Sequence, residues 1–231
     1  MIKILKELKE ERRRKRRARR FQGSEAFWES LYSRGGTSGS GSYGRLALFK
    51  AEIVNGFVRE HGITSVIEFG CGDGNQLSLA DYPKYVGLDV SRSVLKRSCE
   101  RFSEDKTKSF FLYNGSAFVD NAGVFSADLA LSLDVIYHMV EDEVLEKYMR
   151  DLFGSAGRYV IIYSANEAGK PDNHLRLRKF TDWVDRDASE WKLAQKIANR
   201  YPFDPNLPDD TSFADFYVFE RVSFPTPSTS G

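Results

Sequence analysis

The sequence is poor in cysteine and histidine, and it contains no long apolar run. Its two cysteines, Cys71 and Cys99, are too few for a disulfide framework. Its three histidines, His61, His138 and His174, show no paired metal-ligand spacing such as CxxC or HExxH. No segment approaches the run of roughly 20 apolar residues that a membrane-spanning helix needs, and the N-terminus lacks the apolar stretch of a secretory signal. These absences predict a cytoplasmic protein that holds no structural metal.

Net charge is also nearly absent, but the charges are unevenly distributed. The 231 residues carry a formal net charge of +1. Residues 1–20 contain 11 Lys or Arg against 3 Glu, a balance of +8, so the other 211 residues carry 23 basic and 30 acidic side chains, a balance of −7. The basic part is therefore a tail rather than a property of the fold.

Apolar side chains in this tail are spaced as on one helical face and precede the run RRRKRRARR, which predicts a basic amphipathic helix. Such a helix can bind an acidic membrane surface, which would place the protein at the membrane periphery, or a nucleic acid or an acidic partner. A solvated extension that aids solubility or assembly is equally compatible with the composition.

Residues 21–44 combine a short aromatic helix with a loop rich in Gly and Ser. Four side chains are spaced as on one helical face: Phe27, Trp28, Leu31 and Tyr32. The loop at 35–44 is either a linker or a mobile flap over a site. Because only the basic tail precedes it, the flap is the better interpretation, and it accounts for Tyr32 and Tyr43 on either side of the loop.

The rest of the chain alternates strand and helix patterns, which is typical of one α/β domain. Strands are predicted at 65–69, 84–89, 109–113, 127–135 and 158–164, and helices at 45–61, 91–102 and 141–154. Segments 190–201 and 211–222 resemble a terminal strand pair. The predicted fold is a doubly wound, mostly parallel, seven-stranded sheet with an antiparallel C-terminal strand, formed by a domain at 45–224 and followed by a tail at 225–231.

The stretch SVIEFGCGDGNQ, residues 65–76, places glycines at the first strand-to-helix turn, where backbone approaches a ligand most closely. The spacing is not the dinucleotide pattern GxGxxG, because Asn75 occupies its third glycine position. No Lys followed by Ser or Thr marks a phosphate-binding loop. Asp89 ends the second strand, 19 residues after Gly70, where an acid can accept hydrogen bonds from both hydroxyls of a ribose.

In these residues the sequence resembles class I S-adenosylmethionine-dependent methyltransferases over roughly residues 45–165. The resemblance implies that the ExGxGxG turn lies under the methionine part of S-adenosyl-L-methionine, that Asp89 takes the ribose and that 133–138 faces the reacting centre. Where the family often has an acid for the adenine, this chain has Gly115 and Ser116. The implied cofactor residues are Glu68, Gly70, Cys71, Gly72, Gly74, Asp89, Val90, Ser116 and Asp134. A tight loop and a helix cap in another α/β enzyme are the alternative interpretation.

Methyl transfer from a sulfonium is an in-line displacement, which requires alignment of the reactants and exclusion of water. If the acceptor is a hydroxyl, a base assists, and His138 just beyond the fourth strand is the candidate. The alternative is that His138 packs or caps the next helix. Tyr137 is a second catalytic candidate, as a positioning group, and Asp134 is predicted to orient cofactor or acceptor.

Downstream of the fifth strand, NHLRLRKF places His174, Arg176 and Arg178 at alternate positions. In an extended segment they would point the same way and form a cationic shelf for phosphate, carboxylate or a sugar nucleotide. In a helix they would splay apart as solvated surface. With Tyr43 of the flap, they are the candidate substrate-binding residues.

Three segments, TSGSGSYGRL, LSLDVIYHMVEDEV and TSFADFYVFER, also resemble small bacterial methyltransferases of surface-glycan and capsule synthesis. This resemblance implies O-methylation of a small, sugar-like or phosphate-bearing acceptor in polysaccharide biosynthesis. One alternative is an RNA methyltransferase anchored by the Arg-rich tail, although no NPPY-type motif follows the fourth strand. The other is a non-catalytic cofactor-binding module that scaffolds a glycosyltransferase.

Overall fold

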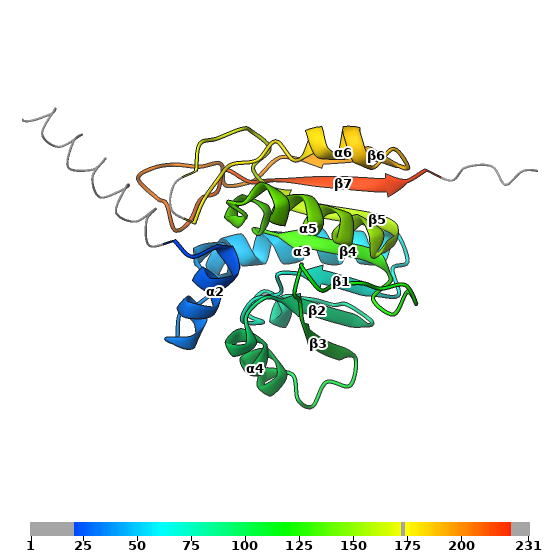
Figure 1. The fold of residues 1–231 in the computed structure, drawn as a ribbon, viewed down its shortest axis with the longest axis horizontal. Helices are drawn as coiled ribbons and strands as arrows, with labels where there is room; N and C mark the ends of the chain where they lie inside the picture. The colour runs from blue at the N-terminus through cyan, green and yellow to red at the C-terminus, as the bar shows by residue number, and fades with distance from the viewer. Residues whose placement is uncertain (1–20, 172–173, 223–231) are drawn as a thin grey trace, which may run out of the picture.

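The computed structural model describes residues 21–171 and 174–222, so the predicted tails at 1–20 and 225–231 lie outside the described residues. The described chain forms one seven-stranded sheet in the order β3-β2-β1-β4-β5-β7-β6 (Figure 1). The strands are β1 (Val66–Phe69), β2 (Tyr85–Asp89), β3 (Lys108–Leu112), β4 (Ala127–Leu133), β5 (Ala156–Ser164), β6 (Trp191–Ile197) and β7 (Asp215–Arg221).

The first five strands pair in parallel, and β7 runs antiparallel to both β5 and β6. The central strands β1 and β4 are mostly buried on both faces, as strands covered by helices on both sides must be. The predicted doubly wound sheet with an antiparallel C-terminal strand is therefore confirmed, as is the terminal strand pair.

Helices cover both faces of this sheet. The described helices are α2 (Ser24–Ser33), α3 (Gly44–Glu60), α4 (Arg92–Arg101), α5 (Asp142–Gly154) and α6 (Thr181–Asp187), with 3-10 turns at Ser40–Ser42, Leu77–Leu79 and Ile136–His138. All of these helices except α2 pack on a face of the sheet. The three predicted helices downstream of residue 44 are confirmed within a few residues, and α6 was not predicted. Ser91 caps α4 by accepting a hydrogen bond from the Val94 N–H, and Gly62 follows α3 with φ +59°.

Side-chain alternation along the strands divides the core into two layers. In β1, Ile67 and Phe69 join the layer beneath α5 and α6, whereas Val66 joins the layer beneath α3. Between β3 and β4 the chain forms no helix, and Phe111 on the edge strand β3 remains 44% exposed. In the part of the chain described, no helix is long and apolar enough to cross a membrane.

Helix α2 lies at the edge where the parallel strands end (Figure 1). At its start, the Ser24 hydroxyl donates to the carbonyl of His138 at 2.8 Å. Further along, the Glu29 carboxylate accepts hydrogen bonds from the hydroxyls of Ser91 and Ser93 at the beginning of α4. These contacts hold α2 across the carboxyl ends of the strands, where α/β proteins bind their ligands.

Candidate active site

The glycine turn after β1 is closely packed. Gly70 and Gly72 have φ of +82° and +58°, a region that disfavours side chains. A Cβ on Gly70 would lie 2.5 Å from a methyl carbon of Val135, and one on Gly72 would lie 2.4 Å from the hydroxyl oxygen of Ser38. Gly74 also has a positive φ, of +73°, and a Cβ on it would lie 2.8 Å from the ring of Phe102, which follows α4.

Two buried carboxylates flank this turn. Glu68 accepts a 2.6 Å hydrogen bond from the Tyr85 hydroxyl, and burial raises its pKa to about 7. Asp89 accepts from the backbone N–H groups of Gly72 at 3.0 Å and Ser91 at 2.9 Å. Burial raises the pKa of Asp89 to about 6, and these N–H bonds oppose the rise. A carboxylate has about four acceptor positions, so both groups can accept further hydrogen bonds from a ligand.

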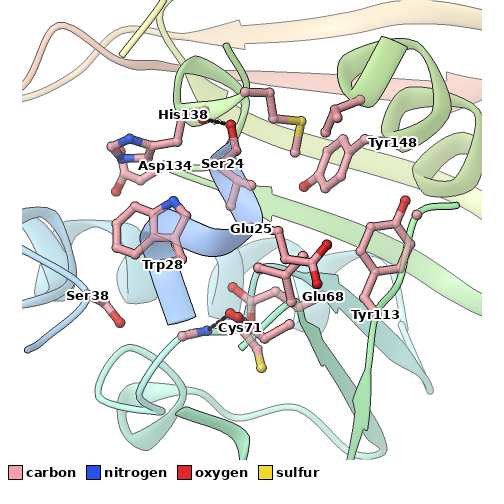
Figure 2. A pocket seen from close by; sticks show the side chains of 18 of the residues that line it. Ser24, Glu25, Trp28, Ser38, Glu68, Cys71, Tyr113, Asp134, His138 and Tyr148 are labelled. Carbon is pink, nitrogen blue, oxygen red and sulfur yellow. Dashed lines mark hydrogen bonds between the residues drawn. The ribbon is translucent and has the colours of Figure 1, made fainter. Parts of the chain in front are cut away.

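A cavity of about 620 Å³ opens between this edge of the sheet and α2, and Figure 2 shows Trp28, Tyr113 and Tyr148 around it. All the predicted cofactor residues except Gly74 line it: Glu68, Gly70, Cys71, Gly72, Asp89, Val90, Ser116 and Asp134. Its volume lies within the roughly 300–1,000 Å³ of small-molecule sites. Buried acceptors for hydroxyls, glycine backbone and aromatic walls in one cavity fit a nucleoside-type cofactor.

The Gly/Ser-rich loop packs onto the glycine turn. The Ser38 N–H donates to the Asp73 carboxylate at 2.9 Å, and the Asp73 N–H donates back to the Ser38 hydroxyl oxygen at 2.9 Å. The Tyr43 hydroxyl donates to the same carboxylate at 2.8 Å. Tyr43, predicted to bind substrate, thus fastens the loop to the turn. It lines neither this cavity nor a second cavity that adjoins it.

Asp134 follows β4 and adopts φ +61°, the one positive value among the described non-glycine residues. Such a conformation costs about 1–3 kcal/mol and persists where surrounding contacts over-determine it. The buried ammonium of Lys50, on α3, donates to Oδ2 at 2.6 Å, and the Tyr137 hydroxyl donates to Oδ1 at 2.7 Å. A Cβ on Gly41 would lie 2.8 Å from Oδ2, so the loop also approaches this carboxylate closely. The carboxylate is therefore fixed at the end of β4.

His138 lies in the 3-10 turn after β4, half-buried beside Trp28, whose ring centroid is 4.8 Å away. Its Nδ1 lies 3.4 Å from the carbonyl oxygen of His174. The tautomer with the proton on Nδ1 makes this contact a hydrogen bond and leaves a lone pair on Nε2. Burial, with a smaller contribution from the neighbouring His174, lowers the pKa of His138 to about 4. The imidazole is therefore unprotonated at neutral pH.

The predicted cationic shelf is not formed. Arg178 is buried and donates to the carbonyls of Met139 and Val140 and to the Asp142 carboxylate. Arg176 pairs with Asp142 at 3.0 Å. Both guanidinium groups hold the chain after β4 in place and line neither cavity, whereas His174 lies beside His138.

Several site residues were missed by the sequence analysis. Lys50 lies among apolar neighbours on α3, and its partner Asp134 is 84 positions away. Trp28 was assigned only to helix packing, and Ser38 only to a flexible loop. No local pattern marks such residues, because their roles arise from contacts between distant segments. Among residues 21–171 and 174–222, no cluster of His, Cys, Asp or Glu could hold a metal ion.

No protein-family profile matches the sequence. A protein of Arabidopsis thaliana named small RNA 2′-O-methyltransferase is 33% identical over 100 residues. The match covers 38% of this chain, which spans about a tenth (11%) of that relative. The solved methyltransferase domain of bacterial CtHen1-C is 23% identical, with a TM-score of 0.59, over 75% of this chain and 97% of that one.

The solved N-methyltransferase NodS of Bradyrhizobium japonicum, in complex with S-adenosyl-L-homocysteine, has a TM-score of 0.66 at 10% identity. The alignment covers 87% of this chain and 99% of that chain. Together with the strand order and the reversed β7, these likenesses define the fold as that of class I S-adenosylmethionine-dependent methyltransferases. The predicted resemblance is confirmed at the level of the fold.

Proposed function

We propose that this chain is an S-adenosylmethionine-dependent methyltransferase that methylates a hydroxyl oxygen of a small acceptor such as a sugar. The observation that carries the proposal is the cavity of about 620 Å³, where glycine turn, buried carboxylates and the His138 imidazole meet. The S-adenosyl-L-homocysteine held by NodS supports the same cofactor here.

In this proposal Asp89 accepts hydrogen bonds from the ribose hydroxyls, and Val90 and Ser116 border the adenine. The glycine turn leaves room for the methionine part. When bound, the cofactor supplies a methyl group already activated on a positively charged sulfur. The residues of the chain then have to orient the acceptor, exclude water and receive a proton.

His138 is proposed to receive that proton from the acceptor hydroxyl. In the tautomer whose Nδ1 donates to the His174 carbonyl, Nε2 is the basic atom. A low pKa keeps the imidazole unprotonated, although it also makes the ring a weak base. Asp134 and Tyr137, fixed to each other, are proposed to orient the acceptor.

Calorimetric titration with S-adenosylmethionine, S-adenosylhomocysteine and NAD tests the cofactor. We expect binding of the first two and no heat with NAD, because the turn lacks the dinucleotide glycine spacing. Turnover is then measured by methyl transfer from labelled cofactor to neutral and anionic sugars. Tight binding of NAD, or no binding of either sulfur compound, would contradict the proposal.

A second candidate acceptor is the ribose 2′-hydroxyl of RNA, favoured by the 33% identity to the Arabidopsis small RNA 2′-O-methyltransferase. The basic residues at 1–20 would then bind phosphates. This candidate predicts methylation of short single-stranded RNA that falls steeply with salt and weakens when residues 1–20 are removed. Salt-insensitive transfer to a free sugar would favour the first candidate.

A further inference from the structure

A second cavity, of about 450 Å³, adjoins the first. The two cavities share Trp28, Ser38, Asp134 and His138 in their walls. A ligand in the second cavity therefore reaches the carboxylate and the imidazole that also face the first. Transfer between two bound molecules requires such a junction, because the reacting groups have to be held together away from water.

Part of the second cavity's wall is a stack of rings. Phe27 and His174 are parallel, with ring centroids 4.2 Å apart, and His138 stacks on His174 at 5.5 Å. The loop residue Ser38 closes the wall toward the glycine turn. Phe27 belongs to α2 and His174 to the segment before α6, so the stack forms only in the folded protein.

Further rings come from the segment between β6 and β7. Phe213 lies edge-on to Tyr137 with centroids 5.3 Å apart, and Phe203 is 6.1 Å from Phe213. Phe203 is 50% exposed and Phe213 44% exposed, so large parts of both rings remain uncovered beside the cavity. Such surfaces bind flat apolar groups by stacking or by edge-to-face contact.

The charge of this wall is close to neutral. Among the described residues that line the cavity there is no lysine or arginine, and the one carboxylate, Asp134, is paired with the buried Lys50. An anionic ligand would lose hydration without gaining a cation. Uncharged hydrogen-bonding groups are supplied by Thr37, Ser38, Ser40, Thr211 and Ser212.

We infer that this cavity is the acceptor site and that it binds an uncharged planar ring attached to the hydroxyl-bearing part of the acceptor. The inference rests on the proposed function and narrows it: the ring contacts Phe203 and Phe213, while the hydroxyl lies at the Asp134 and His138 junction. Anionic acceptors are disfavoured, in contrast to the expectation of a cationic shelf.

The test uses three probes that differ in one feature at a time: phenyl β-D-glucoside, methyl β-D-glucoside and phenyl β-D-glucuronide. Each is titrated by ligand-observed NMR into the full chain saturated with S-adenosylhomocysteine. We expect the phenyl glucoside to bind about tenfold more tightly than either other probe. The methyl glucoside lacks the ring that contacts Phe203 and Phe213, and the glucuronide adds a carboxylate for which the described residues of the cavity offer no cation.

Two variants provide a matched comparison, since Phe213 and Phe111 are each 44% exposed and only Phe213 lines the cavity. Phe213→Ala is expected to reduce phenyl glucoside affinity about fivefold to tenfold, and Phe111→Ala to leave it unchanged. Both variants should retain the affinity for S-adenosylhomocysteine.

The outcomes separate the two claims. If S-adenosylhomocysteine does not bind, the proposed function itself is wrong. If it binds but the two glucosides bind equally or not at all, or if both variants behave alike, the acceptor site has been wrongly assigned. Tighter binding of the glucuronide would likewise overturn the neutral character proposed for the site.

Discussion

On the β1 and β2 side of the site, the proposed cofactor-binding residues come from the glycine turn after β1 and from the end of β2. Glu68, Gly70, Gly72 and Asp89 lie within 22 residues of sequence. Their contacts are largely made with backbone, as in the N–H bonds to Asp89. On the β4 to β7 side, the rings and polar groups come from α2, the loop at 37–41, the turn after β4 and the segment between β6 and β7.

The difference reflects what each side binds. The cofactor is the same in every reaction, so the backbone geometry of a short sequence motif can hold it. The acceptor has to be selected from other molecules, and the side chains that select it come from several loops. Asp134 and His138 belong to both sides, because both line the two cavities. Variants that affect one side, or both at once, therefore test this division into a cofactor side and an acceptor side.

The largest effect is expected from Lys50→Met, which removes the cation paired with Asp134. Breaking a buried ion pair by removing one partner costs about 3–5 kcal/mol. We expect a loss of that size in the free energy of unfolding, measured by urea denaturation, because the Asp134 carboxylate, only 12% exposed, loses its cation and its support at φ +61°.

The double variant Lys50→Met with Asp134→Asn is the control. It should recover much of the stability, since no unpaired charge remains. If Lys50→Met alone unfolds with less than about 1 kcal/mol of loss, the ion pair does not hold the junction between the cavities.

His138→Ala tests the proposed proton acceptor, which lies where the two cavities meet. We expect kcat to fall about 100-fold, the lower end for general-base catalysis, because a ring with a pKa of about 4 is a weak base. Cofactor affinity should not change. In the wild type, kcat/KM should fall only as the pH approaches 4. An unchanged kcat would assign His138 to packing.

Asp89→Ala tests the cofactor side alone. Loss of hydrogen bonds to an ionised group is expected to weaken S-adenosylmethionine binding by about 10-fold to 100-fold, as measured by calorimetry. Affinity of the phenyl glucoside probe should be retained. Weakening of less than about threefold would remove the ribose contact from the assignment.

The sequence predicted the fold because its signals are local. Alternating apolar strands, the Ser91 cap and the glycine turn each follow from neighbouring residues, and so does the position of Asp89 at a strand end. Helix α6 was missed because its seven residues are too few to show a clear 3.6-residue repeat.

The acceptor side was predicted in part only. His138 was singled out because it follows β4, but the roles of Arg176 and Arg178 were wrong. Alternation was taken to expose them together, whereas carbonyls beyond β4 and the Asp142 carboxylate bind them. A guanidinium that serves as internal support and one that binds a ligand have the same sequence pattern, and only the distribution of acceptors around them differs.

The smaller of the two expected effects on stability concerns Glu68, which lines the cofactor cavity and not the second cavity. Its pKa is raised by burial from 4.5 to about 7, so the folded state holds a proton that the unfolded state has lost between these pH values. Stability contributed by this group is therefore present below pH 4.5 and decreases as the pH rises through 7. Glu68→Gln cannot titrate, so the wild type should lose about 2–3 kcal/mol relative to this variant between pH 5 and pH 8. His138, with its pKa lowered to about 4, acts in the opposite direction, because stability is lost as the pH falls from 6.5 towards 4.

Urea denaturation of the wild type and of Glu68→Gln between pH 5 and pH 8 measures the Glu68 contribution by itself. The His138 contribution is the same in both proteins and cancels in the difference between their free energies of unfolding. A pH-independent difference would mean that Glu68 is ionised in the folded protein, and the cofactor side would then hold two buried negative charges.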